Sequence, residues 1–103
     1  MEIIKGGTAV SPQGFTASGV MSGVKESGNS DLSLLVSETN CAAAAVVTQY
    51  QVVAAPVIVD RETVAANPSG IRAVVPTSGT ANACTGQPGL ANARALQAAT
   101  AEA

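Results

Sequence analysis

The amino-acid sequence predicts a single α+β domain, and three observations lead to this class. Apolar, β-branched runs bounded by Gly and Pro turns are typical of strands. Two of these runs near the start of the chain have the spacing of a β-hairpin. An Ala-rich stretch at the end predicts a helix. The chain has 103 residues, which is the length of one domain.

The N-terminal part predicts an arm followed by the hairpin. Residues 1–14 carry several turn-forming Gly and Pro residues. Residues 15–24 predict the first strand, and residues 31–37 alternate in polarity as a second strand does. The polar residues 25–30 have the composition of the connecting loop. The side chains expected to face inward from the second strand are Leu32, Leu34 and Val36.

The middle of the chain is ambiguous between helix and strand. In residues 41–48 the Ala run favours helix and the following Val pair favours strand, and we assign a strand to the Val end. Residues 52–59 form another apolar run, in which Pro56 restricts any strand to an edge or a bulge. Residues 60–66 predict a short helix that ends at the strong turn signal of residues 67–70.

The C-terminal part contains the stretch best suited to chemistry. Residues 71–75 predict a mostly buried strand. Residues 77–86 are all Thr, Ser, Gly, Ala, Asn or Cys, so the backbone can pass close to a ligand and present its N–H groups. A helix follows, with Pro88 in its first turn and a run of Ala to residue 103. The arc of this helix expected to lie on the sheet contains Leu90, Ala93 and Leu96.

Composition limits the classes of partner. Hydrophobic residues make up 47% of the chain, but only Phe15 and Tyr50 are aromatic, so the core is thin and we expect it to lean on additional protein. The net charge of −2 is spread without a basic run, which disfavours nucleic acid and anionic membranes. The sequence shows no secretory apolar region, and we expect a cytoplasmic protein. Because the last helix has no stop signal, we also expect a fragment or a processed subunit of a longer protein.

Side-chain chemistry is sparse. The chain has no His, which excludes a Ser-His-Asp triad or a Cys-His pair within it. Cys41 and Cys84 do not have the spacing of a zinc motif, and we interpret them as small buried or half-buried thiols. The charges of residues 60–62 are interpreted as a solvated helix face rather than a functional cluster. We expect no metal and no cofactor.

Backbone chemistry is the remaining candidate. The hydroxyls of Ser78 and Thr85 have no neighbouring base, so neither is expected to be a nucleophile. Thr85 and Gly86 lie where the loop meets the helix, and unpaired N–H groups there suit an oxyanion hole. Gly86 also lets an acyl group approach closely. An ordinary strand-to-helix connection in a small-residue core is the alternative.

Residues 77–86, Thr-Ser-Gly-Thr-Ala-Asn-Ala-Cys-Thr-Gly, resemble the Asn-Ser-Gly-Asn-Ala-Asn-Ala-Cys-Thr-Gly signature of the ornithine acetyltransferase (glutamate N-acetyltransferase) family of arginine biosynthesis. We call residues 77–86 the signature loop. The resemblance extends in order over nearly the whole chain. Further matching segments are residues 12–15, 18–20, 31–37 and 53–57, together with Gly23, Lys25, Arg61 and Glu62.

The resemblance implies a layered α-β-β-α sandwich made from a precursor that cuts itself before a threonine. That threonine begins the C-terminal β chain and becomes the nucleophile, which takes acetyl from N-acetylornithine and passes it to glutamate. Some family members also accept acetyl-CoA. The active oligomer contains two α and two β chains, and its signature Thr-Gly pair, here Thr85 and Gly86, forms the oxyanion hole.

On this reading residues 1–103 are the N-terminal portion of a single α+β domain, from the α chain, and the segment that bears the nucleophile is absent. The chain alone is therefore expected to be inactive. Thr77 and Thr80 stand where the family usually has Asn, and Tyr50 and Gln51 replace a usual Asn-Arg pair. The alternative is a non-catalytic scaffold or subunit of a related fold.

Overall fold

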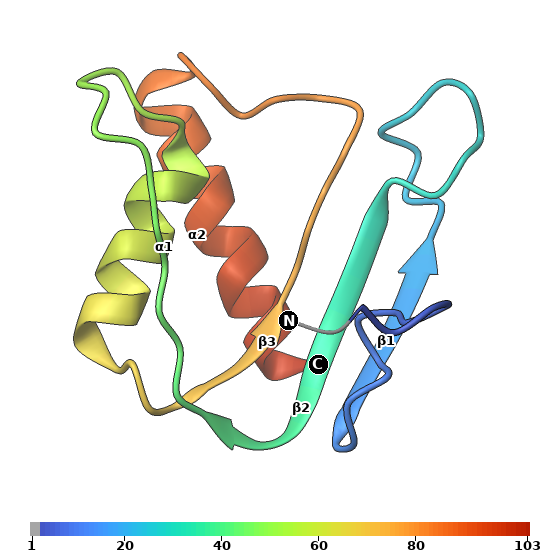
Figure 1. The fold of residues 1–103 in the computed structure, drawn as a ribbon. Coiled ribbons are helices and arrows are strands. Elements are labelled where there is room, and N and C mark those ends of the chain that lie inside the picture. Colours follow the sequence, from blue (N-terminus) through green and yellow to red (C-terminus); the bar gives the residue numbers. More distant parts are fainter. Residues whose placement is uncertain (1–2) are drawn as a thin grey trace.

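The computed structural model describes residues 3–103 as a small antiparallel sheet beside a pair of helices (Figure 1). The mixed α and β composition expected from the sequence is confirmed. Residues 3–14 form the expected arm with turns, while Met1 and Glu2 of that arm lie outside the described residues. In chain order the elements are β1 (Phe15–Val20), β2 (Leu32–Cys41), α1 (Ala55–Ala66), β3 (Ile71–Val74) and α2 (Gly86–Glu102).

The sheet has three strands in the order β1-β2-β3, and every pairing is antiparallel. The predicted hairpin is confirmed, since β1 pairs with β2 in a regular register that sets Phe15 opposite Ser37. The other edge of β2 pairs with β3, with Val74 opposite Leu35. β2 is therefore the central strand, and the segment that follows β3 starts beside it.

Arg72 of β3 stabilises an irregular part of the sheet. The register between β2 and β3 shifts between Val36 and Cys41, which leaves carbonyl groups without a ladder partner. The Arg72 guanidinium donates from Nε and Nη2 to the Ser37 carbonyl at 3.2 and 2.9 Å, and from Nη2 to the Glu38 carbonyl at 3.2 Å. A charged side chain thus replaces the missing backbone donors.

The strand predicted at the Val end of residues 41–48 is wrong. β2 continues only to Cys41, and residues 42–50 belong to no helix or strand. Val46 is fully exposed and has no strand beside it. The preference of Val for strands depends on packing against neighbours, and where the chain leaves the sheet this preference has nothing to act on.

The apolar run of residues 52–59 is the start of a helix and not a strand. α1 begins at Ala55 and places Pro56 in its first turn, where a missing N–H costs no hydrogen bond. The helix predicted over residues 60–66 is the second half of α1. It ends at Ala66, before Asn67, as expected, and the N–H of the C-cap residue Asn67 donates to the Thr63 carbonyl.

α2 packs on α1 and not on the sheet, which corrects the role expected for its apolar arc. Pro88 stands in the first turn as predicted. Arg94 of α2 forms an ion pair with Glu62 of α1 at 2.9 Å, and Gln97 Nε2 donates to Thr63 Oγ1 at 2.6 Å. The Arg94–Glu62 pair is half exposed and contributes little stability.

The chain buries little of its own apolar surface. Ala55 and Val59 are the buried apolar residues of the described part, and Leu32, Leu34 and Val36 are half-buried. The strand β3, expected to be mostly buried, is exposed at three of its four positions. The accessible surface is 7747 Å², whereas a self-contained protein of this mass exposes about 5,300 Å². Within residues 3–103, no helix has the length and apolarity needed to cross a membrane.

Candidate functional site

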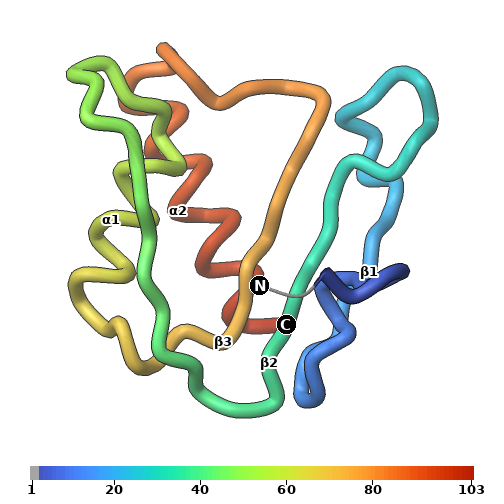
Figure 2. The backbone as a smooth tube through the Cα atoms, in the orientation of Figure 1, coloured from blue at the N-terminus to red at the C-terminus, as the bar shows by residue number. Residues whose placement is uncertain are grey.

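The signature loop runs first beside β2 and then crosses to the start of α2 (Figure 2). Thr77 forms a bridge with Leu32, and the Ser78 N–H donates to the Asp31 carbonyl at 2.8 Å. These contacts lie at the beginning of β2. The loop is therefore tied to the sheet at one end and enters the helix pair at the other.

Asp31 lies at this end of β2 and holds the connection between β1 and β2 through its side chain. Its side chain is buried, with 3% of its surface exposed. Oδ1 accepts from the Ser22 N–H at 2.6 Å and from Ser22 Oγ at 2.8 Å, and Oδ2 accepts from the Lys25 N–H at 2.8 Å. The hydrogen bond from the Ser22 N–H, followed by that from the Lys25 N–H, holds the pKa of the Asp31 carboxyl well below its usual range despite burial. Asp31 is thus an ionised structural anchor.

We expect Asp31→Asn to destabilise the folded protein at neutral pH, because the new amide N–H groups face either the Ser22 or the Lys25 donors. A carboxyl whose pKa is lower in the folded state stabilises the fold above its unfolded pKa of about 3.9, and this contribution disappears as pH falls below that value. The difference in melting temperature between wild type and variant should therefore be large at pH 7 and shrink below pH ~4.

The matched control for this prediction is Asp60→Asn, which makes the same chemical change on the exposed face of α1. It should leave the melting temperature nearly unchanged across the pH range. An Asp31→Asn variant as stable as the wild type at pH 7 would show that the loop does not depend on this carboxylate.

Thr85 and Gly86 lie where the signature loop turns into α2. Thr85 is the N-cap residue, with right-handed φ −97° and ψ −2°. It stands between two residues of positive φ, Cys84 at 56° and Gly86 at 63°. Alternating right- and left-handed residues turn successive N–H groups towards one point, the backbone arrangement of anion-binding nests. The positive φ favours glycine at position 86.

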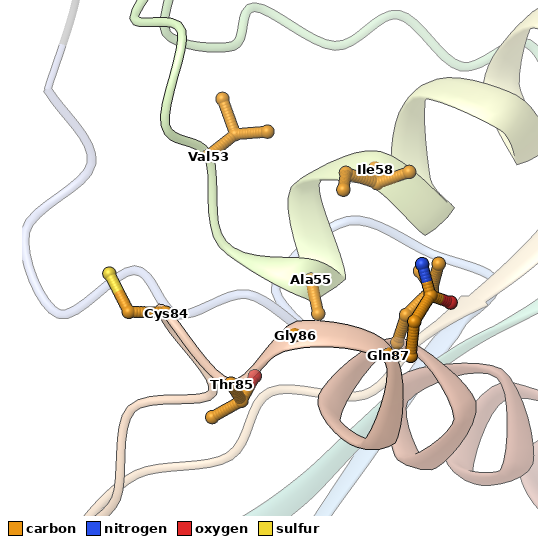
Figure 3. A pocket seen from close by; sticks show the side chains of 8 residues that line it. Val53, Ala55, Ile58, Cys84, Thr85, Gly86 and Gln87 are labelled. Atoms are coloured by element: carbon orange, nitrogen blue, oxygen red, sulfur yellow. The ribbon is translucent and has the colours of Figure 1, made fainter.

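A shallow hollow of about 200 Å³ opens beside these residues (Figure 3). One wall is apolar and comes from the start of α1 and from Val53, two residues before that helix, and the other is the chain at the start of α2. Ligand pockets usually measure about 300–1,000 Å³, so this hollow holds only part of a small molecule. Its lining residues are Val53, Ala55, Ile58, Cys84, Thr85, Gly86, Gln87 and Leu90.

The N–H groups beside the hollow are available to a ligand. The N–H groups of Gly86 and Gln87 have no hydrogen-bond partner among residues 3–103. The Gly89 N–H donates to the Thr85 carbonyl at 3.4 Å and begins the helical pattern. The positive end of the α2 dipole adds to the field of the unpaired donors, so the hollow favours an oxygen that carries negative charge.

Asn82 and Gly89 complete the site, although sequence reasoning did not single them out. Asn82 Nδ2 donates to the Gly89 carbonyl at 2.8 Å, and Thr85 Oγ1 donates to Asn82 Oδ1 at 2.5 Å. The Asn82 carbonyl accepts from the Ala55 N–H at 3.1 Å. Gly89 is buried, and a glycine inside an Ala-rich helix was the available signal of close packing.

The other candidate residues have structural or surface positions. Cys41 is half-buried, as expected, and its Sγ contacts Ser37 Oγ at 3.1 Å. Cys84 is exposed at the rim of the hollow, so the expectation of a buried thiol is wrong there. The side chains of residues 60–62 are exposed on α1, in agreement with a solvated face. In the part of the chain that the structure describes, no three Cys, Asp or Glu residues group together as a metal site would require.

Comparison with known proteins gives consistent matches. The model of the ArgJ family matches residues 16–103. The arginine biosynthesis bifunctional protein ArgJ of Thermotoga neapolitana is 48% identical over 91 residues, which are 88% of this chain and 23% of that protein. Its counterpart from Listeria monocytogenes is 44% identical over 102 residues, 99% of this chain and 25% of that protein. The chain thus spans about a quarter of the length of these relatives.

Solved structures show the same similarity. The crystal structure of the ArgJ protein from Bacillus halodurans superposes with a TM-score of 0.90 at 39% identity, covering 96% of this chain and 51% of that one. The ornithine acetyltransferase of Mycobacterium tuberculosis, solved in complex with ornithine, gives a TM-score of 0.77 at 45% identity, covering 82% of this chain and 44% of that one.

Proposed function

Because this chain belongs to the ArgJ family, we propose that it is the N-terminal part of an acetyltransferase of arginine biosynthesis. The proposed reaction moves an acetyl group from N-acetylornithine to glutamate, with acetyl-CoA as a second possible donor. The pathway is supported by the names of the relatives, which are arginine biosynthesis bifunctional proteins. The proposed contribution of this chain to the chemistry is an oxyanion hole at Thr85 and Gly86.

The observation that supports this contribution is the unpaired backbone at the start of α2. The N–H groups of Gly86 and Gln87 have no partner among residues 3–103, and they border a hollow with an apolar wall. Donors fixed at the position where charge develops stabilise a tetrahedral intermediate more than the uncharged substrate. An acetyl group has the matching parts, since its methyl group is apolar and its carbonyl oxygen becomes negative during transfer.

In the proposed mechanism, a threonine on another segment attacks the acetyl carbonyl carbon of N-acetylornithine. The carbonyl electron pair moves to oxygen, and the donors at Thr85 and Gly86 stabilise that charge. The intermediate collapses, the C–N bond breaks, and ornithine leaves with a proton on its amine. The glutamate amine then attacks the acetyl-threonine ester, and a second collapse releases N-acetylglutamate and the free threonine.

We propose that the other parts of the catalytic unit, including the nucleophile, come from protein outside this chain. The chain has no His, and among residues 3–103 those that line the hollow include no Asp, Glu or Lys. Its surface exceeds that of a self-contained protein of its size by roughly 2,400 Å². We assign that surface to contacts with a C-terminal β chain that carries the nucleophile and adds the second sheet of a layered sandwich, in an assembly of two α and two β chains.

The test is acetyl transfer from N-acetylornithine to glutamate by the complete protein and by the isolated 103-residue chain. We expect the complete protein to turn over and the isolated chain to show no transfer, because the nucleophile is elsewhere. Intact-mass measurement of the active sample should show a second polypeptide that begins with threonine. A complete, folded protein without transfer would support the scaffold alternative. Transfer by the isolated chain would refute the proposal that the nucleophile lies on another segment.

A further inference from the structure

The orientation of the Asn82 amide determines which atom donates in its bond to Thr85. The Gly89 carbonyl can only accept a hydrogen bond, so the group of Asn82 that faces it, at 2.8 Å, is the Nδ2 donor. The opposite group, Oδ1, therefore faces Thr85 Oγ1 at 2.5 Å, and the Thr85 hydroxyl must supply the proton. The hydrogen bonds around Asn82 fix this direction without ambiguity.

A hydroxyl has a single proton, and in this structure the proton of Thr85 is directed to Asn82. Figure 3 shows the Thr85 methyl group pointing away from Val53 and Ala55, with the hydroxyl oxygen on the side of Gly86. In this resting arrangement, the donors that remain for a ligand include the N–H groups of Gly86 and Gln87. Donation by the Thr85 hydroxyl to a ligand requires its O–H bond to rotate away from Asn82 Oδ1.

We propose, on the basis of the function proposed above, that Asn82 is a positioning residue for the Thr85 hydroxyl. A neutral amide oxygen is a weaker acceptor than an alkoxide-like oxygen, because hydrogen bonds to ionised groups are about twice as strong. The Thr85 O–H group therefore stays directed at Asn82 Oδ1 while the acetyl carbonyl is uncharged, and it turns to the carbonyl oxygen as negative charge develops there. Such a donor favours the transition state over bound substrate.

Asn82 is suited to this role because it also joins the elements of the site. Its backbone carbonyl accepts from the Ala55 N–H at the start of α1, and its Nδ2 holds the Gly89 carbonyl of α2. The residue that orients Thr85 is thus held to α1 by its backbone and to α2 by its side chain. Its position does not depend on the ligand.

The first test is a double-mutant cycle in the complete protein. Thr85→Val removes the hydroxyl with its shape kept, and Asn82→Ala removes the acceptor. Each change should lower kcat about 10²-fold with little effect on KM, the loss typical of one oxyanion donor. Because Asn82 acts through Thr85, the double variant should be no slower than the slower single variant. Losses that multiply to about 10⁴-fold would overturn the proposal.

The second test is a pH profile, and it remains available if Asn82→Ala does not fold. Asn82→Asp keeps the shape of the side chain but places a carboxylate against the Gly89 carbonyl. The negative charge holds the Thr85 O–H group as a hydrogen-bond donor to itself, and it also repels the oxyanion. Protonation restores one donor and one acceptor, so kcat relative to wild type should recover as pH falls through the carboxyl pKa. The control Asn92→Asp makes the same change at an exposed position of α2 and should follow the wild-type profile.

The outcomes separate the two proposals. Wild-type protein without acetyl transfer refutes the proposed function. Wild-type protein with full transfer, together with an Asn82→Asp profile that matches that of Asn92→Asp, refutes the role of Asn82 and leaves the function standing.

Discussion

Gly89→Ala should lower kcat by about 10²-fold or more although alanine is the better helix former. A Cβ at position 89 would lie 1.7 Å from Thr85 Oγ1 and 2.4 Å from both Thr85 Cβ and Asn82 Oδ1. These distances are far below van der Waals contact, so the Thr85 side chain must move. Displacement of a catalytic group by about 1 Å can cost about 10²-fold in rate. Steady-state kinetics of the complete protein, with acetyl transfer as the readout, measures the effect.

Helix propensity separates the expected effect of Gly89→Ala on kcat from its effect on the melting temperature. In a helix interior alanine is favoured over glycine by about 1 kcal/mol, so α2 itself gains stability from the change while the contact with Thr85 is lost. We therefore expect a melting temperature that changes little and a kcat that falls strongly. Gly19→Ala is the control, because a Cβ there meets its nearest atom, the Leu32 carbonyl oxygen, at an ordinary 3.8 Å.

If Gly89→Ala retains wild-type kcat, the Thr85 side chain can leave its place without consequence. The hydroxyl would then have no part in transfer, and the backbone N–H groups would be the remaining donors. If both Gly19→Ala and Gly89→Ala lose activity together with folding, the effect is one of stability and says nothing about geometry.

The elements predicted correctly are those whose pattern depends on near neighbours in the chain. The hairpin follows from alternation on either side of a polar loop, and it forms as expected with Phe15 opposite Ser37. The start of α2 follows from Pro88, whose lack of an N–H suits a first turn. Local steric and hydrogen-bonding rules decide these elements.

The elements predicted wrongly depend on contacts with distant residues. Pro56 suits either a strand edge or a first helical turn, and the choice is made where the Ala55 N–H finds the Asn82 carbonyl, far along the chain. β3 has a strand pattern with buried composition, but its surface is largely open here. How much of such a strand is covered depends on what packs against its faces, so no reading of these residues alone gives its exposure.

The same distinction applies to the site. Thr85 and Gly86 could be proposed from sequence, because a small-residue loop that precedes a helix has unpaired N–H groups by construction. Asn82 could not, since its role arises from the direction of its amide between Gly89 and Thr85. The spacing alone allows many other partners for an asparagine. Side-chain direction is fixed only by the folded backbone.

Thr85→Val should lower kcat about 10²-fold with KM changed little, if the hydroxyl stabilises the developing oxyanion. Valine keeps the branched shape of threonine and removes only the donor. Thr85→Ser is the matched control, because it keeps the hydroxyl and loses one methyl group at an exposed position. It should retain most of the wild-type kcat. Both variants are measured in the complete protein, with the melting temperature recorded beside the kinetics.

The pair of variants separates three roles for Thr85, because each role removes a different quantity. A hydroxyl donor gives a slow Val variant and an active Ser variant at unchanged melting temperature. A hole made only of the backbone N–H groups of Gly86 and Gln87 leaves both variants active, since neither change alters the main chain. A purely structural Thr85 gives a Val variant with lower melting temperature and normal kcat, because the bond to Asn82 is lost while no transition-state contact is removed.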